Sequence, residues 1–381
     1  MARKRLLIFY LVDDFEVFHR TPMIRALARN AVGHFDVLCV SPPVSFASYF
    51  GRRRFGDFRP GKLDELGDNL FHFLPRIIEG RDLPRFIFRP DHYYKKFAEQ
   101  IRRLPIFSGF WGDSINWIYR IEQRPIVEDS RGLPFVYECY DDYTRDLSSG
   151  REKRGSFEAE RSLIRASLLT FTTSRELFRS RREISDSVVY APNGADFSHF
   201  ARKTHYVPPF DYPRPVIGYV GNISDFLDYS LIEETVRILP HFSFVFVGPV
   251  TSREAKRLRA YSNVHFEGFI ERRDLPRYVS SFDAALIPFK VNEAMNAVNP
   301  LKLWEYLAAG KAVISTPIRE MLKYGDVVYI ASGGREYAEA VRRAASSKDR
   351  DRRERGLKIA EKHSWGSLTG KMLKTLMEAL N

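Results

Sequence analysis

The stretch NPLKLWEYLAAGKAVIST, residues 299–316, predicts a short helix followed directly by a buried strand. Asn299 is suited to cap this helix, Pro300 to its first position, and Gly310 to the position just past its end. At about 100° per residue, one broad arc of the helix carries Leu301, Leu303, Trp304, Leu307 and Ala308. The opposite arc carries Lys302, Glu305, Tyr306 and Ala309. A helix docked on a sheet therefore places a cation and a carboxylate together near its first turns.

Strand-like and helix-like segments alternate outward from this stretch. Up to residue 200, the short apolar runs are RLLIFYLV, FDVLCVS, NWIYRI, PFVYECY, LLTFTTS and SVVYAP. Helix-length segments such as Thr21–Asn30 and Phe157–Ala166 separate most of these runs. From residue 215 the alternation returns in VIGYVGN, SFVFVGP, NVHFEGF, AALIPF, KAVIST and VVYI. Strands that alternate with helices predict an α/β fold with parallel, doubly wound sheets.

A segment rich in proline and aromatic residues, ARKTHYVPPFDYPR, separates the two alternating halves. We therefore predict a Rossmann-like domain over residues 1–200, a linker over 201–214 and a second Rossmann-like domain over 215–362. Residues 363–381 are amphipathic and predict a C-terminal helix that packs back on the N-terminal domain. Ligands of such sheets bind beyond the carboxyl ends of the strands, so we expect the site in a cleft between the domains.

The 381-residue chain is strongly basic, with a net charge of +12. This excess favours an anionic partner, such as a nucleotide, a nucleic acid or an anionic lipid. No run approaches the ~20 apolar residues of a membrane-spanning helix, and MARKRLLIFYLVDDFE lacks the small-residue cleavage site of a signal peptide. Cys39 and Cys139 lie in apolar, strand-like runs. We therefore expect buried thiols, a reducing compartment and a cytoplasmic protein.

Residues 45–110 interrupt the alternation and interleave Arg and Lys with Phe, Tyr and Trp. They include the basic run Arg52, Arg53 and Arg54. Such a mixture suits an anionic membrane surface, or single-stranded nucleic acid with its bases stacked on the rings. The alternative is a solvated loop region whose aromatic side chains fill a local core.

The helix of the opening stretch is expected to begin at the carboxyl edge of its sheet, because it follows the strand AALIPF and a ten-residue loop. Its free N–H groups favour an anion there, and Lys302 adds a full positive charge. Glu305 lies one turn further on the same face, where its carboxylate can accept both hydroxyls of a ribose. The alternative is an internal Lys302–Glu305 pair on a packed helix.

The helix and strand PLKLWEYLAAGKAVIST resemble the nucleotide-sugar-binding segment of GT-B glycosyltransferases, and the likeness extends over nearly the whole chain. The closest resemblance is to family 4-like bacterial enzymes that build cell-surface polysaccharides. The other matching segments, in chain order, are YECYDDY (137–143), TFTTSREL (170–177), APNGADFSHF (191–200), PVIGYVGNISDFLD (215–228), FVFVGP (244–249) and NVHFEGFIERRDLPRYVSSFDAALIPF (263–289). The resemblance implies two Rossmann-like domains that face a cleft.

The resemblance also implies roles for four donor-side residues. Glu305 matches the acidic residue that binds the donor ribose, and Lys302 is placed for the diphosphate. Gly221 lets a phosphate approach the backbone, with a tight turn as the alternative. Phe269 matches the residue whose backbone meets the base, with core packing as the alternative.

Two features depart from the family pattern. Ala297 occupies the position, eight residues before Glu305, where the family usually has a second acidic residue. The segment GNISDFLDYS contains none of the Arg and Lys residues that the family commonly carries after the first donor-domain strand. Lys290 and Lys302 are the candidates to replace that charge. The helix without its first acidic residue is also similar to exopolysaccharide glucuronosyltransferases, which invert the sugar's configuration, whereas family 4 retains it.

Asp141 and Asp142 follow the predicted strand PFVYECY and so stand at the cleft. An inverting transferase needs a base for the acceptor hydroxyl, and a carboxylate serves if its pKa is raised. Successive strand side chains take opposite faces, so only one of the pair can face the cleft, and we prefer Asp141. The alternative is a loop pair that caps a turn. Two adjacent acids without a third ligand make a poor metal site, and we expect no metal.

His19 and Arg20, in the loop after the first predicted strand, are further candidates for acceptor or donor contacts. We thus expect a glycosyltransferase, peripherally bound to the inner face of the cell membrane, that moves a sugar from a nucleotide-sugar donor to a saccharide or lipid-linked acceptor. We expect a UDP-sugar as the donor rather than a GDP-sugar, and inversion of the configuration at the anomeric carbon. We expect no cofactor besides this co-substrate and no nucleic-acid partner. The alternatives are a nucleotide-sugar epimerase of the same fold, a non-catalytic scaffold that kept the fold, and a basic nucleic-acid-binding protein.

Overall fold

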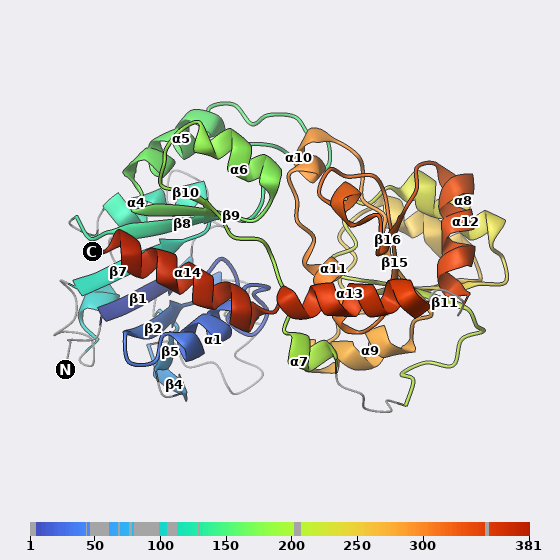
Figure 1. Cartoon of the computed structure of the whole chain (residues 1–381), viewed down its shortest axis with the longest axis horizontal. Coiled ribbons are helices and arrows are strands. Elements are labelled where there is room, and N and C mark those ends of the chain that lie inside the picture. The colour runs from blue at the N-terminus through green and yellow to red at the C-terminus, as the bar shows by residue number, and fades with distance from the viewer. Residues whose placement is uncertain are drawn as a thin grey trace.

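The computed structural model contains two α/β domains that lie side by side, and the chain passes from one to the other and back again (Figure 1). The N-terminal domain is built on an eight-stranded sheet and the C-terminal domain on a six-stranded sheet. The predicted α/β class with two Rossmann-like domains is therefore confirmed. The structure describes residues 5–42, 44–45, 61–67, 69–75, 78–79, 99–104, 113–128, 130, 132–201, 207–346 and 350–381.

The N-terminal sheet has the strand order β10-β9-β8-β7-β1-β2-β5-β4. Its neighbouring strands are parallel except for the pair β4 and β5. Because β1 lies between β2 and β7, the strand order reverses at β1, and a crevice is expected at the carboxyl ends of β1 and β7. Its strands are β1 (Arg5–Tyr10), β2 (Phe35–Val40), β4 (Leu63–Gly67), β5 (Leu70–Phe73), β7 (Ser114–Ile118), β8 (Phe135–Cys139), β9 (Leu169–Thr172) and β10 (Val188–Tyr190). A separate parallel pair joins β3 (Val44–Ser45) and β6 (Ile78–Glu79).

Helices cover both faces of this sheet, because successive side chains of each strand point to opposite faces. On β1, Leu7 and Phe9 belong to the core shared with α1 and α14, whereas Leu6, Ile8 and Tyr10 belong to the core shared with α4, α5 and α6. Figure 1 shows these two groups of helices on opposite sides of the strands. The helices of this domain are α1 (Thr21–Asn30), α4 (Arg124–Glu128), α5 (Ser156–Ala166) and α6 (Arg175–Arg182).

The C-terminal sheet is entirely parallel, with the strand order β13-β12-β11-β14-β15-β16. The order reverses between β11 and β14, which places a second crevice at the carboxyl ends of these two strands. Its strands are β11 (Val216–Val220), β12 (Ser243–Val247), β13 (Val264–Gly268), β14 (Ala284–Ile287), β15 (Ala312–Ser315) and β16 (Val328–Ile330). The helices of this half are α7 (Phe197–Phe200), α8 (Tyr229–Ile238), α9 (Leu275–Ser281), α10 (Glu293–Asn296), α11 (Leu301–Ala308), α12 (Gly334–Ala345) and α13 (Arg350–Lys362).

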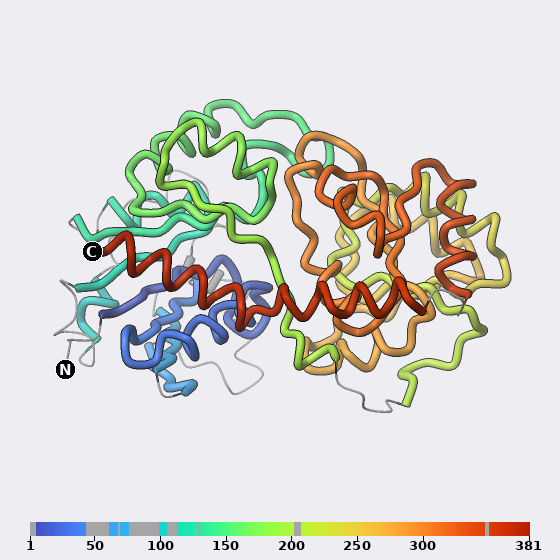
Figure 2. The backbone as a smooth tube through the Cα atoms, viewed as in Figure 1, coloured from blue at the N-terminus to red at the C-terminus, as the bar shows by residue number. Residues whose placement is uncertain are grey.

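The end of the chain returns to the N-terminal domain. Helix α13 packs on α11, and α14 (Trp365–Ala379) continues from it across to α1 (Figure 2). The side-chain amide of Asn30 on α1 donates hydrogen bonds to the Gly366 carbonyl at 2.8 Å and to the Thr369 hydroxyl at 2.9 Å. Trp365 and Leu376 join the N-terminal core. The C-terminal helix thus buries its apolar face on the first domain.

Three local features differ from the sequence predictions or extend them. Within residues 45–110, which interrupt the predicted alternation, β4 and β5 pair as an antiparallel hairpin, and Phe71 and Phe73 are buried in the core. The ten-residue loop before α11 contains the short helix α10. Cys39 and Cys139 are free and buried, as predicted. In the part of the chain that the structure describes, every helix is too short or too polar to cross a bilayer.

Candidate functional site

A pocket of about 520 Å³ lies between the domains, where the carboxyl ends of the two sheets meet. The N-terminal domain lines it with residues that follow β1 and β8, among them His19 and Asp141. The C-terminal domain lines it with residues that follow β11, β12, β13 and β14, and with the first turns of α11. Both places where the strand order reverses therefore open into one pocket, as expected for ligand sites of doubly wound sheets.

Helix α11 is fixed against the end of β11 by Tyr306, whose hydroxyl accepts a hydrogen bond from the Val220 N–H at 2.7 Å. Tyr306 is fully buried, although it shares the predicted arc of Lys302 and Glu305. The reason is that α11 packs on β14 and β15, is covered by α13, and directs Tyr306 toward the end of β11. Only Lys302 and Glu305 of the predicted polar arc line the pocket.

Asn299 does not cap α11, which corrects the prediction for this residue. The helix begins at Leu301 with Pro300 in the N-cap position. The Asn299 side chain instead donates a hydrogen bond to the Thr173 carbonyl at 3.0 Å, and its backbone carbonyl accepts one from the Asn193 side chain at 2.6 Å. Both partners belong to the N-terminal half. The entrance to α11 is therefore bonded across the domain boundary.

Lys302 is held at the pocket wall between two aromatic rings. Its Nζ lies 5.1 Å from the ring centroid of Tyr219 and 5.2 Å from that of Phe289. Burial lowers the pKa of Lys302 to about 8, against the opposing effect of Glu305 and Asp141. Gly221 has a φ of 137°, and a Cβ there would lie 2.9 Å from the Lys302 Nζ. The positive φ favours glycine at this position, and the absent side chain leaves space beside the ammonium.

Glu305 lies one turn along α11 from Lys302 and forms an ion pair with Arg272. The Arg272 Nη1 is 3.1 Å from the Glu305 Oε1, and both side chains are partly exposed in the pocket. Phe269, in the same loop as Arg272, is 60% exposed. It lines the pocket, so the alternative of core packing is wrong for this ring.

Asp141 faces the pocket from the end of β8, and Asp142 does not. Burial raises the pKa of Asp141 to about 7, although Arg120, Arg20 and Lys302 act in the opposite direction. No hydrogen bond reaches the Asp141 carboxylate from any residue that the structure describes. The expectation that only one of the two carboxylates can face the cleft is confirmed. The carboxylate of Asp141 is the one that a ligand can reach.

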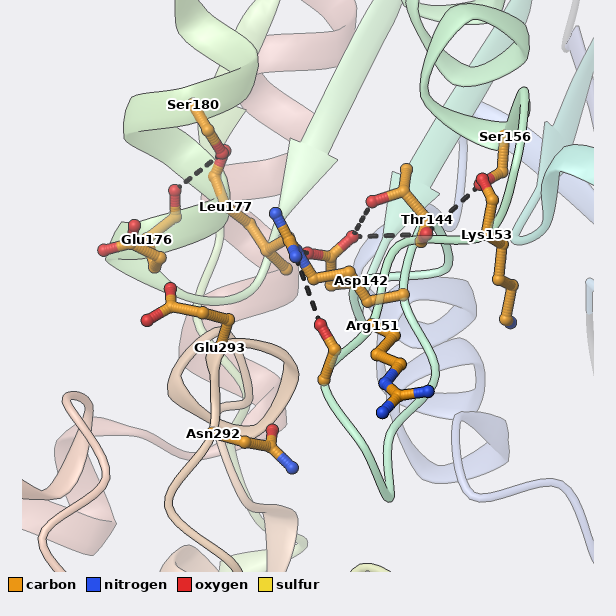
Figure 3. Close-up of polar contacts among 12 residues, drawn as sticks. Asp142, Thr144, Arg151, Lys153, Ser156, Glu176, Leu177, Ser180, Asn292 and Glu293 are labelled. Atoms are coloured by element: carbon orange, nitrogen blue, oxygen red, sulfur yellow. Dashed lines mark hydrogen bonds and ion pairs between the residues drawn. The ribbon is translucent and has the colours of Figure 1, made fainter.

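Asp142 is instead part of a buried ion network with Arg181 and Glu160, and Figure 3 shows its hydrogen bonds from Thr144. One of its oxygens lies 2.8 Å from the Arg181 Nη2 and accepts a hydrogen bond from the Thr144 hydroxyl at 2.5 Å. Arg181 also pairs with the buried Glu160 at 2.8 Å. The side chain of Asp142 is thus fully engaged away from the pocket, and its geometry fits a structural role.

His19 and Arg20 differ in their position relative to the pocket. His19 lines the pocket, with its ring edge-on to Tyr140 at 4.7 Å between centroids. Burial, followed by the charge of Arg20, lowers the pKa of His19 to about 3, so its imidazole is neutral at physiological pH. Arg20 is buried behind the pocket, where it pairs with Glu138 and donates a hydrogen bond to Asn193. Its guanidinium is therefore not placed to touch a ligand.

Lys290 and the basic run of the first domain are not part of the described pocket. Lys290 follows β14, but its Nζ lies 3.7 Å from Glu254 Oε1 and the residue does not line the pocket. The prediction that Lys290 lies beside a phosphate of the donor is therefore wrong for this structure. Arg52, Arg53 and Arg54 lie outside the described residues.

Arg272 and Asn193 are polar residues of the pocket that sequence reasoning did not single out. Both occur in segments that carry the family resemblance, GFIERR and APNGAD. A cation three residues after the predicted base-binding Phe269 was the available signal for Arg272. Within the described residues, no group of three or more His, Cys, Asp or Glu side chains is arranged to hold a metal ion.

Two Rossmann-like domains with a shared pocket at their strand ends define the GT-B fold, and solved structures confirm it. The chain superimposes on sucrose-phosphate synthase from Thermosynechococcus elongatus with a TM-score of 0.76 at 13% identity, over 99% of both chains. It superimposes on Anabaena Alr3699/HepE in complex with UDP and glucose with a TM-score of 0.66 at 13% identity, over 98% of this chain and 99% of that one. At these identities the likeness establishes the fold.

The matches found by sequence comparison cover part of the chain. Residues 214–347 match the family model of "Glycosyl transferases group 1". A stretch of 107 residues is 36% identical to the "Putative teichuronic acid biosynthesis glycosyltransferase TuaH" of Bacillus subtilis (strain 168). This match covers 26% of the chain and 26% of that relative. The C-terminal domain, with α11 and the Arg272 loop, thus resembles the group 1 glycosyltransferases.

Proposed function

We propose that this protein is a glycosyltransferase that moves a sugar from a nucleotide-sugar donor to a saccharide or lipid-linked acceptor. The observation that carries the proposal is the composition of one pocket. The C-terminal domain offers Lys302 and Glu305 on α11, and the N-terminal domain offers the carboxylate of Asp141. A site for an anionic donor and a candidate base therefore face each other between two domains.

The donor would bind to the C-terminal wall. The ribose hydroxyls would donate hydrogen bonds to Glu305, and the diphosphate would lie beside Lys302, the free N–H groups of α11 and Gly221. The base would stack near Phe269. The positive charge of Lys302 would stabilise the diphosphate as the bond to the sugar breaks. No metal is part of this proposal.

Asp141 would act as the base of an inverting reaction. The acceptor hydroxyl would give its proton to the Asp141 carboxylate while its oxygen forms a bond to the anomeric carbon from the face opposite the diphosphate. The nucleoside diphosphate would leave with the electron pair of the broken bond. A pKa of about 7 suits this task, because about half of the carboxyl groups are then ionised near neutral pH and each carboxylate is basic enough to take a proton.

A UDP-sugar is proposed as the donor and bacterial cell-surface polysaccharide synthesis as the setting. The structure of HepE was solved with UDP and glucose, and TuaH is described as acting in teichuronic acid biosynthesis. We further propose a place at the cytoplasmic face of the membrane, which is supported by the basic and aromatic composition of residues 45–110.

The first test is a thermal-shift screen of the full chain with UDP, GDP and their sugars. A ligand that binds only the folded state raises the melting temperature, and UDP compounds are expected to do so most. NMR of the product with a transferable donor then reports the configuration at the new anomeric carbon. Retention of the donor's configuration would contradict the inverting mechanism, and the absence of any nucleotide effect would contradict the proposal as a whole.

The membrane proposal has a separate test. Replacing Arg52, Arg53 and Arg54 by Ser should reduce flotation of the protein with vesicles that contain anionic lipid, and added salt should weaken flotation of the wild type. Equal flotation of the variant and the wild type would favour the alternative of a solvated loop.

A further inference from the structure

The structure leaves the donor diphosphate with few cations in the C-terminal domain. The loop after β11, residues 221–228, contains no Lys or Arg. Lys290 pairs with Glu254 and does not line the pocket. Among the described residues of the C-terminal half that line the pocket, Arg272 and Lys302 carry the positive charges. A diphosphate group carries at least two negative charges, so Lys302 alone leaves it incompletely neutralised.

Arg272 is held in the pocket by three contacts. Its side chain is 31% exposed and pairs with Glu305, whose side chain is 14% exposed. Its guanidinium carbon lies 5.8 Å from the ring centroid of Phe200 on α7, and its backbone carbonyl accepts a hydrogen bond from the His199 ring at 3.0 Å. The backbone of Arg272 is thus anchored, and its guanidinium rests on Glu305 and Phe200 while the side chain stays partly exposed and lines the pocket.

The pair with Glu305 places Arg272 beside the expected position of the diphosphate. Residues three apart on a helix are neighbours on one face, with about 5–6 Å between their Cβ atoms, so Lys302 and Glu305 mark adjacent positions along α11. A guanidinium has five N–H donors, and one described ion pair leaves several of them for another anion. Arg272 can therefore reach a phosphate that Lys302 contacts from the other side.

We propose that Arg272 is the second cation of the donor diphosphate site, and that it turns from Glu305 to the phosphates when the ribose hydroxyls take its place on the carboxylate. The inference rests on the proposed function, since it assigns a further residue to the same donor. It also explains how this chain binds a diphosphate without the basic residues that are missing after β11. The alternative is that Arg272 only orients Glu305.

Calorimetry with uridine and UDP distinguishes these two roles, with Arg272→Gln compared to wild type. A phosphate contact predicts that UDP affinity falls by about 10- to 100-fold, whereas uridine affinity changes by less than about threefold. A role confined to orienting Glu305 predicts equal losses for both ligands, because both carry the ribose. Equal losses, or no loss for UDP, would overturn the inference.

Two further variants complete the test. Arg273→Gln is the matched control, because Arg273 is 79% exposed, pairs with Glu271 and does not line the pocket. It removes the same charge from the same loop, and its UDP affinity should remain near the wild-type value. In a Glu305→Ala background, Arg272→Gln should still weaken UDP binding, whereas an orienting role predicts no further loss. If the wild type binds GDP instead of UDP, guanosine and GDP are compared in the same way. If it binds neither, the proposed function fails together with this inference.

Discussion

The two walls of the pocket are built differently. The C-terminal wall carries three charged groups among apolar side chains, with Lys302 and Glu305 on one helix and Arg272 paired with Glu305. The N-terminal wall places His19 and Asp141 among aromatic rings, where burial dominates their titration. The first arrangement suits a ligand of fixed charge. The second suits a proton transfer, because burial moves the pKa of a carboxyl upward.

The largest effect is expected at the N-terminal wall. Asp141→Asn should lower turnover by about 10²- to 10⁴-fold, which is the usual contribution of a general base. Its nucleotide affinity should change little, because no donor contact is proposed for Asp141. Steady-state kinetics and calorimetry on the same preparation separate the two quantities. Near-normal turnover of Asp141→Asn would remove this residue from the base role.

The pH dependence gives an independent check of the same assignment. A base must be deprotonated, so activity should fall as the pH drops below the Asp141 pKa of about 7. An ammonium must be protonated to hold a phosphate, so donor binding should weaken as the pH rises above the Lys302 pKa of about 8. His19 stays neutral in this range. The profile of kcat/KM should therefore be bell-shaped with its maximum between these values, and a profile that is flat from pH 6 to 9 would contradict both assignments.

The neighbouring carboxylate should affect stability instead of catalysis. Asp142→Asn removes one of two carboxylates from the buried Arg181, and Glu160 remains as a partner. We expect the free energy of unfolding to fall by up to about 3 kcal/mol, at the lower end of the cost of breaking a buried ion pair. Urea unfolding measures this loss, and Asp146→Asn in the same loop, at an exposed turn, is the control with a smaller loss. A stable but inactive Asp142→Asn protein would reverse the roles of the two residues.

Much of the fold could be predicted because alternation and periodicity are local properties. The helix Thr21–Asn30 has the bounds that its pattern indicates, and β8 lies one residue inside the predicted run PFVYECY at each end. The hairpin of β4 and β5 was missed, although the letters GDN, which begin at the last residue of β4 and lead to β5, are a turn signal. Its strand LDELG has little of the apolar alternation that marks a half-buried strand, and the surrounding segment is dominated by basic and aromatic residues.

The pocket was predicted less completely, because spacing gives the direction of a side chain but not its partner. Alternation correctly separated Asp141 from Asp142, and helical spacing placed Lys302 beside Glu305. The same spacing placed Tyr306 on the arc of Lys302 and Glu305, but this side chain is fully buried and its hydroxyl contacts the end of β11. Arg20 and Lys290 stand near strand ends as expected, but long side chains reach acidic partners that lie far away in the sequence.

At the C-terminal wall, Glu305→Ala should weaken nucleotide binding without unfolding the protein. The loss of hydrogen bonds to a charged acceptor is expected to cost about 1.5–3 kcal/mol of binding free energy. Calorimetry with UDP measures this cost, and the melting temperature shows whether the variant is folded. Unchanged affinity in a folded variant would mean that the Glu305–Arg272 pair is internal to the protein and that the donor binds elsewhere.

The smallest effect is expected for Lys290→Gln, and it tests whether the C-terminal wall is preorganised. The sequence makes Lys290 and Lys302 equivalent candidates, but in the structure only Lys302 lines the pocket, while Lys290 lies 3.7 Å from Glu254. Lys302→Gln should therefore lower UDP affinity at least about tenfold, and Lys290→Gln less than about twofold. Both variants lose one positive charge, so both lose the same long-range electrostatic attraction for UDP. This shared loss should fade as the salt concentration is raised to about 0.5 M. A tenfold loss for Lys290→Gln at high salt would show that its ammonium leaves Glu254 for the donor. The ligand would then draw basic side chains of this wall out of their ion pairs. The two walls would differ in the mobility of their side chains as well as in their charge.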